Sequence, residues 1–179
     1  MKLTLFTLCM SCLFFTFLSC GEDELDLDGP KYEFDVKQVE VIPIELDGTN
    51  GDWMSFMFKN TLTINNEETK HYSNKIREVR INRLTYRIIN FNGDPLGEVN
   101  GSLSVANKVC LENSFVVKST ADNQIIYEIK AIEEIHRISE ALKANQTVNV
   151  VYSGSALCND MGMDFFIELT LDSKVIIQL

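Results

Sequence analysis

Ile76-Arg-Glu-Val-Arg-Ile-Asn-Arg-Leu-Thr-Tyr-Arg-Ile-Ile-Asn-Phe91 is the longest patterned stretch of the chain and decides its fold class. Val79 and Ile81 are apolar at alternating positions, which is the period of a β-strand with one buried face. A second alternating set follows on the opposite phase, at Leu84, Tyr86 and Ile88. Because a change of phase moves side chains to the other face of a sheet, we expect a β-bulge or a crossing between sheets near Asn82-Arg83.

Two further strand patterns precede this stretch. From Phe34 to Val41 apolar residues nearly alternate, with one slip of phase and Pro43 soon after. A slip combined with a proline predicts a bulged edge strand, because proline cannot donate to a sheet ladder. After the turn-rich loop 47–52, the segment 53–58 places three apolar side chains on one face, which predicts a core strand: Met54, Phe56 and Phe58.

The remaining segments continue the β pattern with one interruption. The sequence Asn92-Gly-Asp-Pro95 predicts a turn, and 97–106 is then the returning strand of a β-hairpin. Shorter strands are expected at 115–118, 125–129, 148–152 and 165–179. Between them the period changes to three and four residues, which predicts one amphipathic helix over about 131–143.

Seven or eight short strands and one helix indicate a mainly β domain, a two-sheet sandwich over residues 32–179. The order of these elements is similar to the immunoglobulin-like domains of many Bacteroidota lipoproteins, and the resemblance implies an immunoglobulin-like sandwich. Antibody domains place a tryptophan between two cysteines, whereas Trp53 precedes both Cys110 and Cys158 here. The resemblance is one of architecture, which does not carry function.

The first twenty residues direct the chain to the cell envelope. Lys2 precedes an apolar segment, 3–18, and Ser19-Cys20 ends it, so residues 1–19 are interpreted as a signal peptide. The sequence Phe17-Leu-Ser-Cys20 resembles the lipobox of bacterial lipoproteins, although that family usually has leucine where Phe17 stands. The resemblance implies that signal peptidase II cuts before Cys20 and that this cysteine carries acyl chains.

Other readings of this region stay open. The apolar segment is near the lower length limit for a retained transmembrane helix. Cys9 and Cys12 are rival cysteines, but cleavage before Cys12 would leave apolar residues 13–18 on the mature protein. Residues 20–31 are acidic and predict an extended tether. Acidic residues directly after the cysteine also resemble the signal that sends Bacteroidota lipoproteins to the outer face of the outer membrane, so we expect the cell surface rather than the periplasmic face.

The charge balance restricts the partners. The chain has 16 basic and 26 acidic residues, and loss of Lys2 with the signal leaves a net charge of −11. Such a charge repels phosphate backbones and anionic head groups, so we expect no nucleic acid partner. Membrane attachment would therefore depend on the lipid at Cys20, since two or three acyl chains give stable anchoring.

Two cysteines remain in the mature protein once Cys9 and Cys12 leave with the signal and Cys20 is acylated. An even number in an oxidising compartment allows a disulfide between Cys110 and Cys158. The alternative is two separate buried cysteines.

Few residues offer catalytic or metal-binding chemistry. His71 and His136 are the only histidines, and neither has a nucleophile in a recognisable motif beside it. We expect no metal and no cofactor, with Asp47 and Asp52 of the loop 47–52 as weak metal candidates only. Trp53, beside that loop, either stacks on a sugar ring or fills the core.

These observations predict a non-enzymatic binding or envelope-assembly module of a lipid-anchored lipoprotein, whose partner is an unidentified protein or glycan. One alternative is a carbohydrate-active or hydrolytic accessory protein of the envelope. Another is an auxiliary subunit of an outer-membrane complex. No motif in the sequence identifies the ligand.

Overall fold

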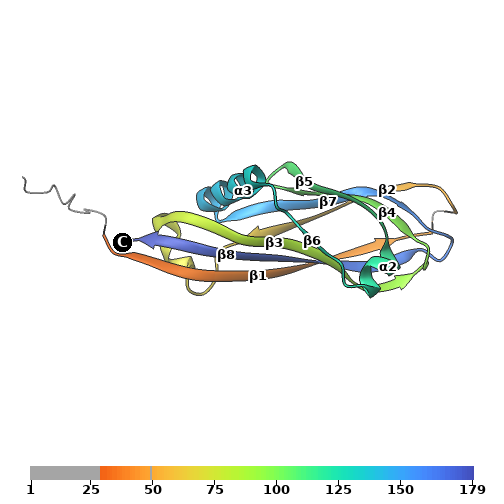
Figure 1. The fold of residues 1–179 in the computed structure, drawn as a ribbon, viewed down its shortest axis with the longest axis horizontal. Helices are drawn as coiled ribbons and strands as arrows, with labels where there is room; N and C mark the ends of the chain where they lie inside the picture. Colours follow the sequence, from red (N-terminus) through yellow and green to blue (C-terminus); the bar gives the residue numbers. More distant parts are fainter. Residues whose placement is uncertain (1–28, 49) are drawn as a thin grey trace, which may run out of the picture.

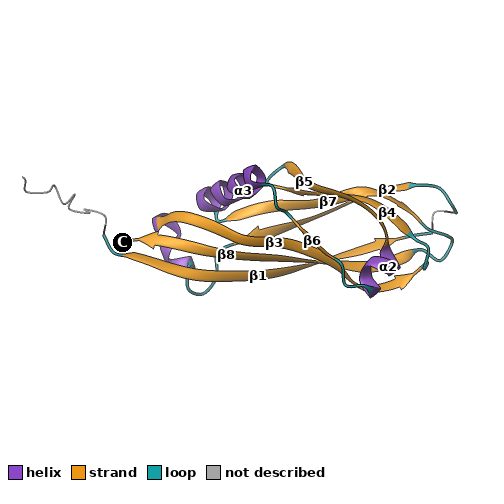
Figure 2. Ribbon diagram, viewed as in Figure 1, coloured by secondary structure: helices purple, strands orange, loops and turns teal. Residues whose placement is uncertain are grey.

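The structure, a computed structural model, describes residues 29–48 and 50–179. The signal peptide, Cys20 and most of the acidic tether therefore lie outside the described residues. The described part is an elongated sandwich of two antiparallel sheets with helices beside it (Figures 1 and 2). In chain order its elements are β1 (Lys31–Leu46), β2 (Met54–Thr63), the 3-10 helix η1 (Lys70–Lys75), β3 (Ile76–Gly93), β4 (Glu98–Val105), β5 (Lys108–Val116), α2 (Val117–Asp122), β6 (Ile126–Glu128), α3 (Ile132–Asn145), β7 (Thr147–Leu157) and β8 (Met163–Gln178).

The strand order corrects the expected immunoglobulin-like topology. One sheet has the order β1-β8-β3-β6 and the other β2-β7-β4-β5. Strands therefore pair from the two ends of the chain inward: β1 with β8, β2 with β7, β3 with β6 and β4 with β5. An immunoglobulin domain pairs its first strand with its second. The observed order is that of a jelly roll, a long antiparallel hairpin rolled into two sheets. A mainly β sandwich was predicted correctly, but local patterns carry no information about which distant strands pair.

The predicted irregularity of the long central strand is confirmed. The pairing of β3 with β8 shifts between Ile81 and Arg83, where the sequence changes phase. Residues before and after this shift can therefore both place their apolar side chains in the core. Val79 and Leu84, on opposite phases, are both buried.

β1 is an edge strand as predicted, but the expected bulge is wrong, because its pairing with β8 runs without a shift. Instead, two polar residues occupy positions on the inward phase. Gln38 Oε1 accepts a hydrogen bond from the Thr63 amide at 2.8 Å, and Glu40 Oε2 accepts one from Asn60 Nδ2 at 3.4 Å. These bonds join β1 to β2 across the side of the sandwich, which explains the slip of hydrophobic phase.

The turn at Asn92-Pro95 is present, but the strands on either side of it do not form the expected hairpin. β3 lies in one sheet and β4 in the other, where β4 pairs with β5 and β7. The turn therefore carries the chain across the sandwich. Turn residues predict that the chain reverses direction, but they do not predict whether the next strand joins the same sheet or the opposite one.

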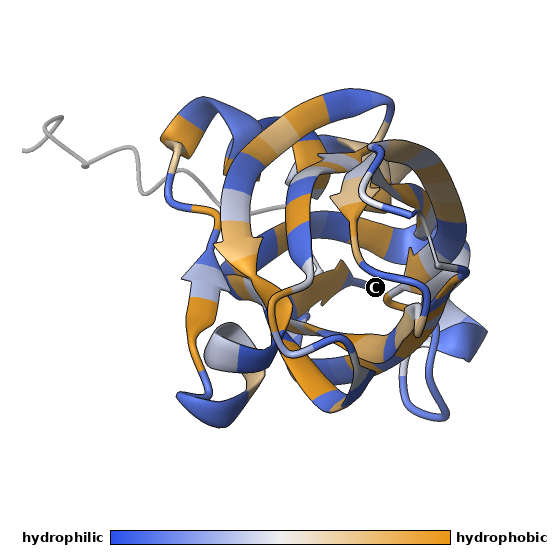
Figure 3. Ribbon diagram, turned by 90° about the vertical axis from the view of Figure 1, so that its right-hand side faces the viewer, coloured by the Kyte–Doolittle hydropathy of each residue, from blue (hydrophilic) through white to orange (hydrophobic). Residues whose placement is uncertain are grey.

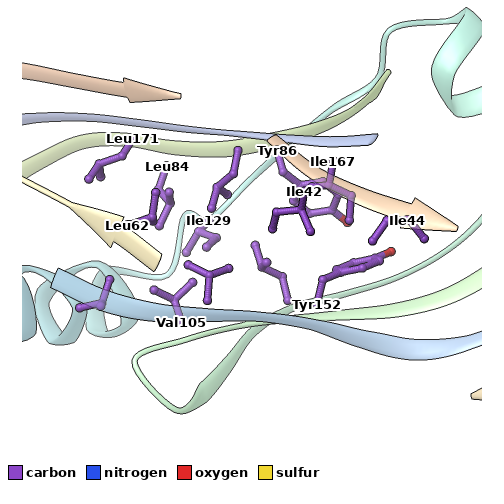
Figure 4. Close-up of a cluster of buried hydrophobic side chains, with 14 of the residues drawn as sticks. Ile42, Ile44, Leu62, Leu84, Tyr86, Val105, Ile129, Tyr152, Ile167 and Leu171 are labelled. Carbon is purple, nitrogen blue, oxygen red and sulfur yellow. The ribbon is translucent and has the colours of Figure 1, made fainter. Parts of the chain in front are cut away.

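The core lies between the sheets and receives alternate side chains from both (Figure 4). Met54, Phe56 and Phe58 all pack in it or against it, as predicted. Phe165 is 1% exposed, whereas Phe166, the next residue, is only partly covered on the outer face of the sheet. Each β-strand therefore has one apolar face in the core, as the alternating patterns predicted.

The helix expected over about 131–143 is present as α3. Ile138 and Leu142 are fully buried, and the helix packs mainly on β3 and also contacts β7. It ends where Gln146 adopts a left-handed conformation, φ 61°, and donates its amide to the Leu142 carbonyl at 2.7 Å. The short helix α2 was not predicted, because six residues hold too little periodicity to detect. No helix in the described ranges is long and apolar enough to cross a membrane.

The sandwich has two distinct ends (Figure 1). The terminal end contains residues 29–31, η1, α3 and the C-terminus, where the Leu179 amide bonds the Pro30 carbonyl at 3.2 Å. The loop end is formed by 47–48, 50–53, 94–97 and 158–162. β1 and β8 have 16 residues each and run between the two ends, a length of about 50 Å at 3.3 Å per residue.

Candidate functional site at the loop end

A shallow hollow of about 550 Å³ lies among the three loops of the loop end. Figure 3 looks onto this end of the sandwich. The lining comes from all three loops and includes Asn50, Asp94, Leu96, Asn159, Asp160 and Met161. Residues far apart in the chain therefore contribute to one surface, because the jelly-roll order brings their loops together.

The buried side chain of Asp94 joins two of these loops. Its Oδ1 accepts the Leu96 amide at 3.0 Å and its Oδ2 accepts the Asn159 amide at 2.8 Å. Its own amide bonds the Gly162 carbonyl at 3.0 Å. A carboxylate that accepts backbone amides makes stronger hydrogen bonds than a neutral acceptor does. Asp94, 6% exposed, is thus an internal brace between 94–97 and 158–162.

Close backbone contacts fix the same loops. Gly93 and Gly162 have φ values of 117° and 67°, a region that residues with a side chain rarely adopt. A Cβ on Gly162 would lie 2.5 Å from the Leu46 carbonyl oxygen, and one on Gly93 would lie 2.5 Å from that of Gly162. The loops are therefore packed directly on one another, which holds the hollow in shape.

Large apolar side chains are exposed on this braced surface. Leu96 is 78% exposed and Met161 is 72% exposed, and both line the hollow. Trp53 is 47% exposed, so it is not the core plug that was one of its two expected roles. Met54 pairs with Ala156, which places Trp53 across from Leu157, another residue of the lining. Grouped exposed apolar residues on a rigid surface are typical of interaction sites.

Carboxylates are frequent in the segments that lead into the loop end, and two of them, Asp94 and Asp160, line the hollow. Residues 43–58, 88–102 and 153–167 contain seven acidic residues and no lysine, arginine or histidine: Glu45, Asp47, Asp52, Asp94, Glu98, Asp160 and Asp164. None of the seven forms an ion pair with another described residue. α2 contacts this end through the hydrogen bond from the Val117 amide to the Gly97 carbonyl, and its Lys118 is paired with Asp122. The loop end therefore keeps a net negative charge, which attracts cations.

The terminal end differs, since it contains a cluster of paired charges on α3. Glu134 of α3 contacts Lys108 Nζ at 2.8 Å and Arg137 Nη2 at 2.6 Å. The hydrogen bonds from Lys108 and Arg137 lower the pKa of Glu134 to about 2. Arg137 also donates to the carbonyls of Val105 and Ala106, at 2.8 and 2.9 Å. This cluster fastens α3 to the turn between β4 and β5, which is a structural role.

The expected metal and histidine candidates do not form a site. Asp47 and Asp52 are exposed at the loop end, and the described ranges contain no group of three or more acidic, histidine or cysteine side chains that could hold a metal ion. His71 and His136 are exposed at the terminal end, in η1 and α3. Neither histidine lines the hollow.

The cysteines of the expected disulfide are not brought together. Cys110 lies on β5, next to Ser104 near the end of β4. Cys158 follows Leu157, the last residue of β7, which pairs with Glu98 at the start of β4. Six residues of β4 separate these levels, a distance of about 20 Å, and a disulfide requires Cα atoms within about 7 Å. Cys110 instead accepts a hydrogen bond from Arg137 Nη2 at 3.2 Å, and burial raises the pKa of its thiol. The expected disulfide is therefore wrong for this fold.

Leu96, Met161 and Asp94 were not singled out from the sequence, although one local signal was available. Both loops place a large apolar residue between turn-forming residues, in Asp94-Pro-Leu-Gly97 and Asn159-Asp-Met-Gly162. Turn tips usually carry small or polar side chains. An apolar residue at a turn tip is therefore a sign of contact with another molecule, or of packing that only the fold can reveal.

No family model matches the chain, and no curated protein matches it either. Matches to solved structures are found at low identity and low structural similarity. A structure of Desmodium yellow mottle tymovirus is 12% identical over 84% of each chain, with a TM-score of 0.40. A decameric BFDV capsid protein is 10% identical over 82% of this chain and 99% of its own, with a TM-score of 0.42. These values carry no argument about function, and the jelly-roll assignment rests on the strand order alone.

Proposed function

We propose that this protein is a lipid-anchored lipoprotein of the outer membrane, facing the cell exterior, whose loop end binds a partner macromolecule without catalysing a reaction. The main support for this proposal is that the terminal end and the loop end lie at opposite ends of the sandwich (Figure 1). The chain enters the domain at the terminal end, and the hollow lies about 50 Å away along the strands. A lipid on Cys20 would therefore direct the hollow away from the membrane.

The loop end has the properties of a binding surface. Leu96 and Met161 are largely exposed on loops that Asp94 and the glycine contacts hold in place. A preformed surface loses little conformational entropy when a partner binds, so more of the contact free energy contributes to affinity. This supports a binding role over a purely structural one.

Carbohydrate binding is a second candidate because Trp53 is half exposed at the rim of the loops. A tryptophan face can stack on the apolar face of a sugar ring. If this candidate is right, the wild-type protein should bind envelope glycans in a binding assay, and Trp53→Ala should abolish that binding. Glycan binding that survives Trp53→Ala would remove this residue from the proposal.

The anchoring is tested by replacing the acylated cysteine. In cells that express the full chain, Cys20→Ala should block lipid addition, so that the protein stays uncut or leaves the membrane fraction. The matched control is Cys110→Ala, which removes a cysteine of the folded domain and should leave processing unchanged. Normal processing and membrane retention of Cys20→Ala would contradict the lipoprotein assignment. Protease added to intact cells should digest the wild-type domain if it faces outward.

A further inference from the structure

We infer that the partner of the loop end is a cationic protein segment that carries apolar side chains between its lysines or arginines. This inference rests on the proposed binding function and adds the chemistry of the partner. It combines two independent observations: the exposed apolar residues that line the hollow, and the unpaired carboxylates of the segments that form the loop end.

The charge of the loop end selects for a cation. Its seven carboxylates have no basic residue among them in the three segments that contain them, and none is in an ion pair with a described residue. Six of them, all except the buried Asp94, are exposed to solvent. Complementary charge steers association and penalises acidic partners, so a positively charged segment is favoured over an acidic one.

The apolar residues explain why a simple cation is not sufficient. Leu96 and Met161 both line the hollow, with 78% and 72% of their surfaces exposed. Only apolar groups of a partner can remove this surface from water. Methionine is flexible and adapts to differently shaped partners. A segment that alternates basic and apolar side chains could pair its charges with the carboxylates of the loop end and pack its apolar side chains in the hollow.

Two other occupants fit the observations less well. A second copy of this chain is disfavoured because the chain has 26 acidic and only 16 basic residues, so two copies repel each other. A metal ion alone would need several ligands close together, and no such group of three exists in the described part of the chain. Both become outcomes of the test.

Trp53 provides the signal for this test, because it is the single tryptophan of the chain and lies at the rim of the hollow. The full-length protein in mild detergent would be titrated with three short tryptophan-free peptides. The first alternates lysine with leucine and phenylalanine, the second replaces lysine with glutamate, and the third replaces leucine and phenylalanine with serine. The first peptide should change the emission of Trp53 saturably, the second should not bind, and the third should bind at least about tenfold more weakly.

Variants locate the binding. Leu96→Ala combined with Met161→Ala should weaken the first peptide about tenfold or more, since central apolar contacts dominate most interfaces. Asp52→Asn combined with Asp160→Asn should weaken it several-fold and reduce its dependence on salt between about 0.05 and 0.5 M. The matched control is Ile132→Ser, which removes an 84% exposed apolar residue from the terminal end and should change nothing.

Several results would overturn the inference. These are equal affinity for the lysine and glutamate peptides, unchanged binding in the Leu96/Met161 variant, or self-association that the carboxylate variant abolishes. A response of Trp53 to calcium or to a glycan, with no response to the lysine peptide, would also overturn it. These results are distinguishable from failure of the proposed anchoring, which is read from membrane retention of Cys20→Ala and does not depend on any peptide.

Discussion

The two ends of the sandwich differ in how they satisfy charge and apolar surface. At the terminal end, α3 buries Ile138 and Leu142, and Glu134 is paired with two basic side chains. At the loop end, Leu96 and Met161 remain exposed and seven carboxylates lack any ion pair within the described residues. The terminal end thus contains a paired charge cluster on a packed helix, whereas the loop end combines exposed apolar side chains in one hollow with carboxylates that have no ion pair among the described residues. Stability and binding are therefore assigned to opposite ends of one fold.

The largest expected effect contrasts a buried and an exposed leucine. Leu142→Ala, on the buried face of α3, should lower the free energy of unfolding by about 3 kcal/mol, through lost burial and the cavity it leaves. Leu96→Ala at the loop end should change it by less than about 0.5 kcal/mol. Urea unfolding of both variants measures the difference. Similar losses for the two would show that Leu96 packs inside the fold and is not a contact residue.

The next effect concerns the brace of the loop end. Asp94→Ala leaves the amides of Leu96 and Asn159 without their acceptor and should cost about 2 kcal/mol in unfolding free energy. Asp160→Ala is the matched control, because this aspartate is exposed. It should have little effect on stability. If Asp94→Ala unfolds like the wild type, the loops are held by other contacts.

A smaller, pH-dependent effect belongs to the terminal end. Because its pKa is lowered from 4.5 to about 2, ionised Glu134 stabilises the folded state above about pH 4.5, and this contribution is lost as the pH falls toward 2. Glu134→Gln should therefore be less stable than the wild type at pH 7, and the difference should disappear near pH 2. Thermal unfolding across this range gives the comparison. A difference that does not change with pH would mean that the charge of Glu134 contributes nothing.

The smallest expected effect is on the unfolding free energy when a surface carboxylate is neutralised, and it differs between the two ends. Glu33→Gln removes the partner of Lys174 at the terminal end, where the two groups are 2.9 Å apart, and should lower the unfolding free energy only slightly, because solvent screens an exposed ion pair. Asp52→Asn removes an unpaired charge from the loop end and should leave stability unchanged or slightly raised. Precise chemical denaturation at low salt resolves such differences. A loss of stability in Asp52→Asn comparable to that in Glu33→Gln would contradict the contrast.

The pattern of apolar and polar residues correctly predicted those features of the fold that depend on neighbouring residues. The phase change at Asn82-Arg83, the edge position of β1 and the helix at about 131–143 all follow from residue periodicity, and all three are present. The pairing of β1 with β8 could not be predicted in this way, because residues about 130 positions apart share no local signal. The immunoglobulin-like order and the disulfide between Cys110 and Cys158 failed for that one reason.

The candidate site was only partly predictable. Trp53 and the loop 47–52 were singled out for their residue types, and both lie at the loop end. Leu96 and Met161 became contact candidates only when the fold brought the loops 94–97 and 158–162 to the same hollow. Asp94 is the clearest example, since as part of a turn motif it predicted a bend, and in the fold its carboxylate joins two loops.

Hydrogen exchange of the full-length protein, with and without the lysine-leucine-phenylalanine peptide, tests the division between the ends most directly. Binding at the loop end should slow exchange in 47–53, 94–97 and 158–162, and leave α3 and η1 unchanged. The same experiment on the Leu96→Ala, Met161→Ala double variant should show no slowing. Protection of α3 or η1 in place of the three loops would contradict the assignment of binding to the loop end.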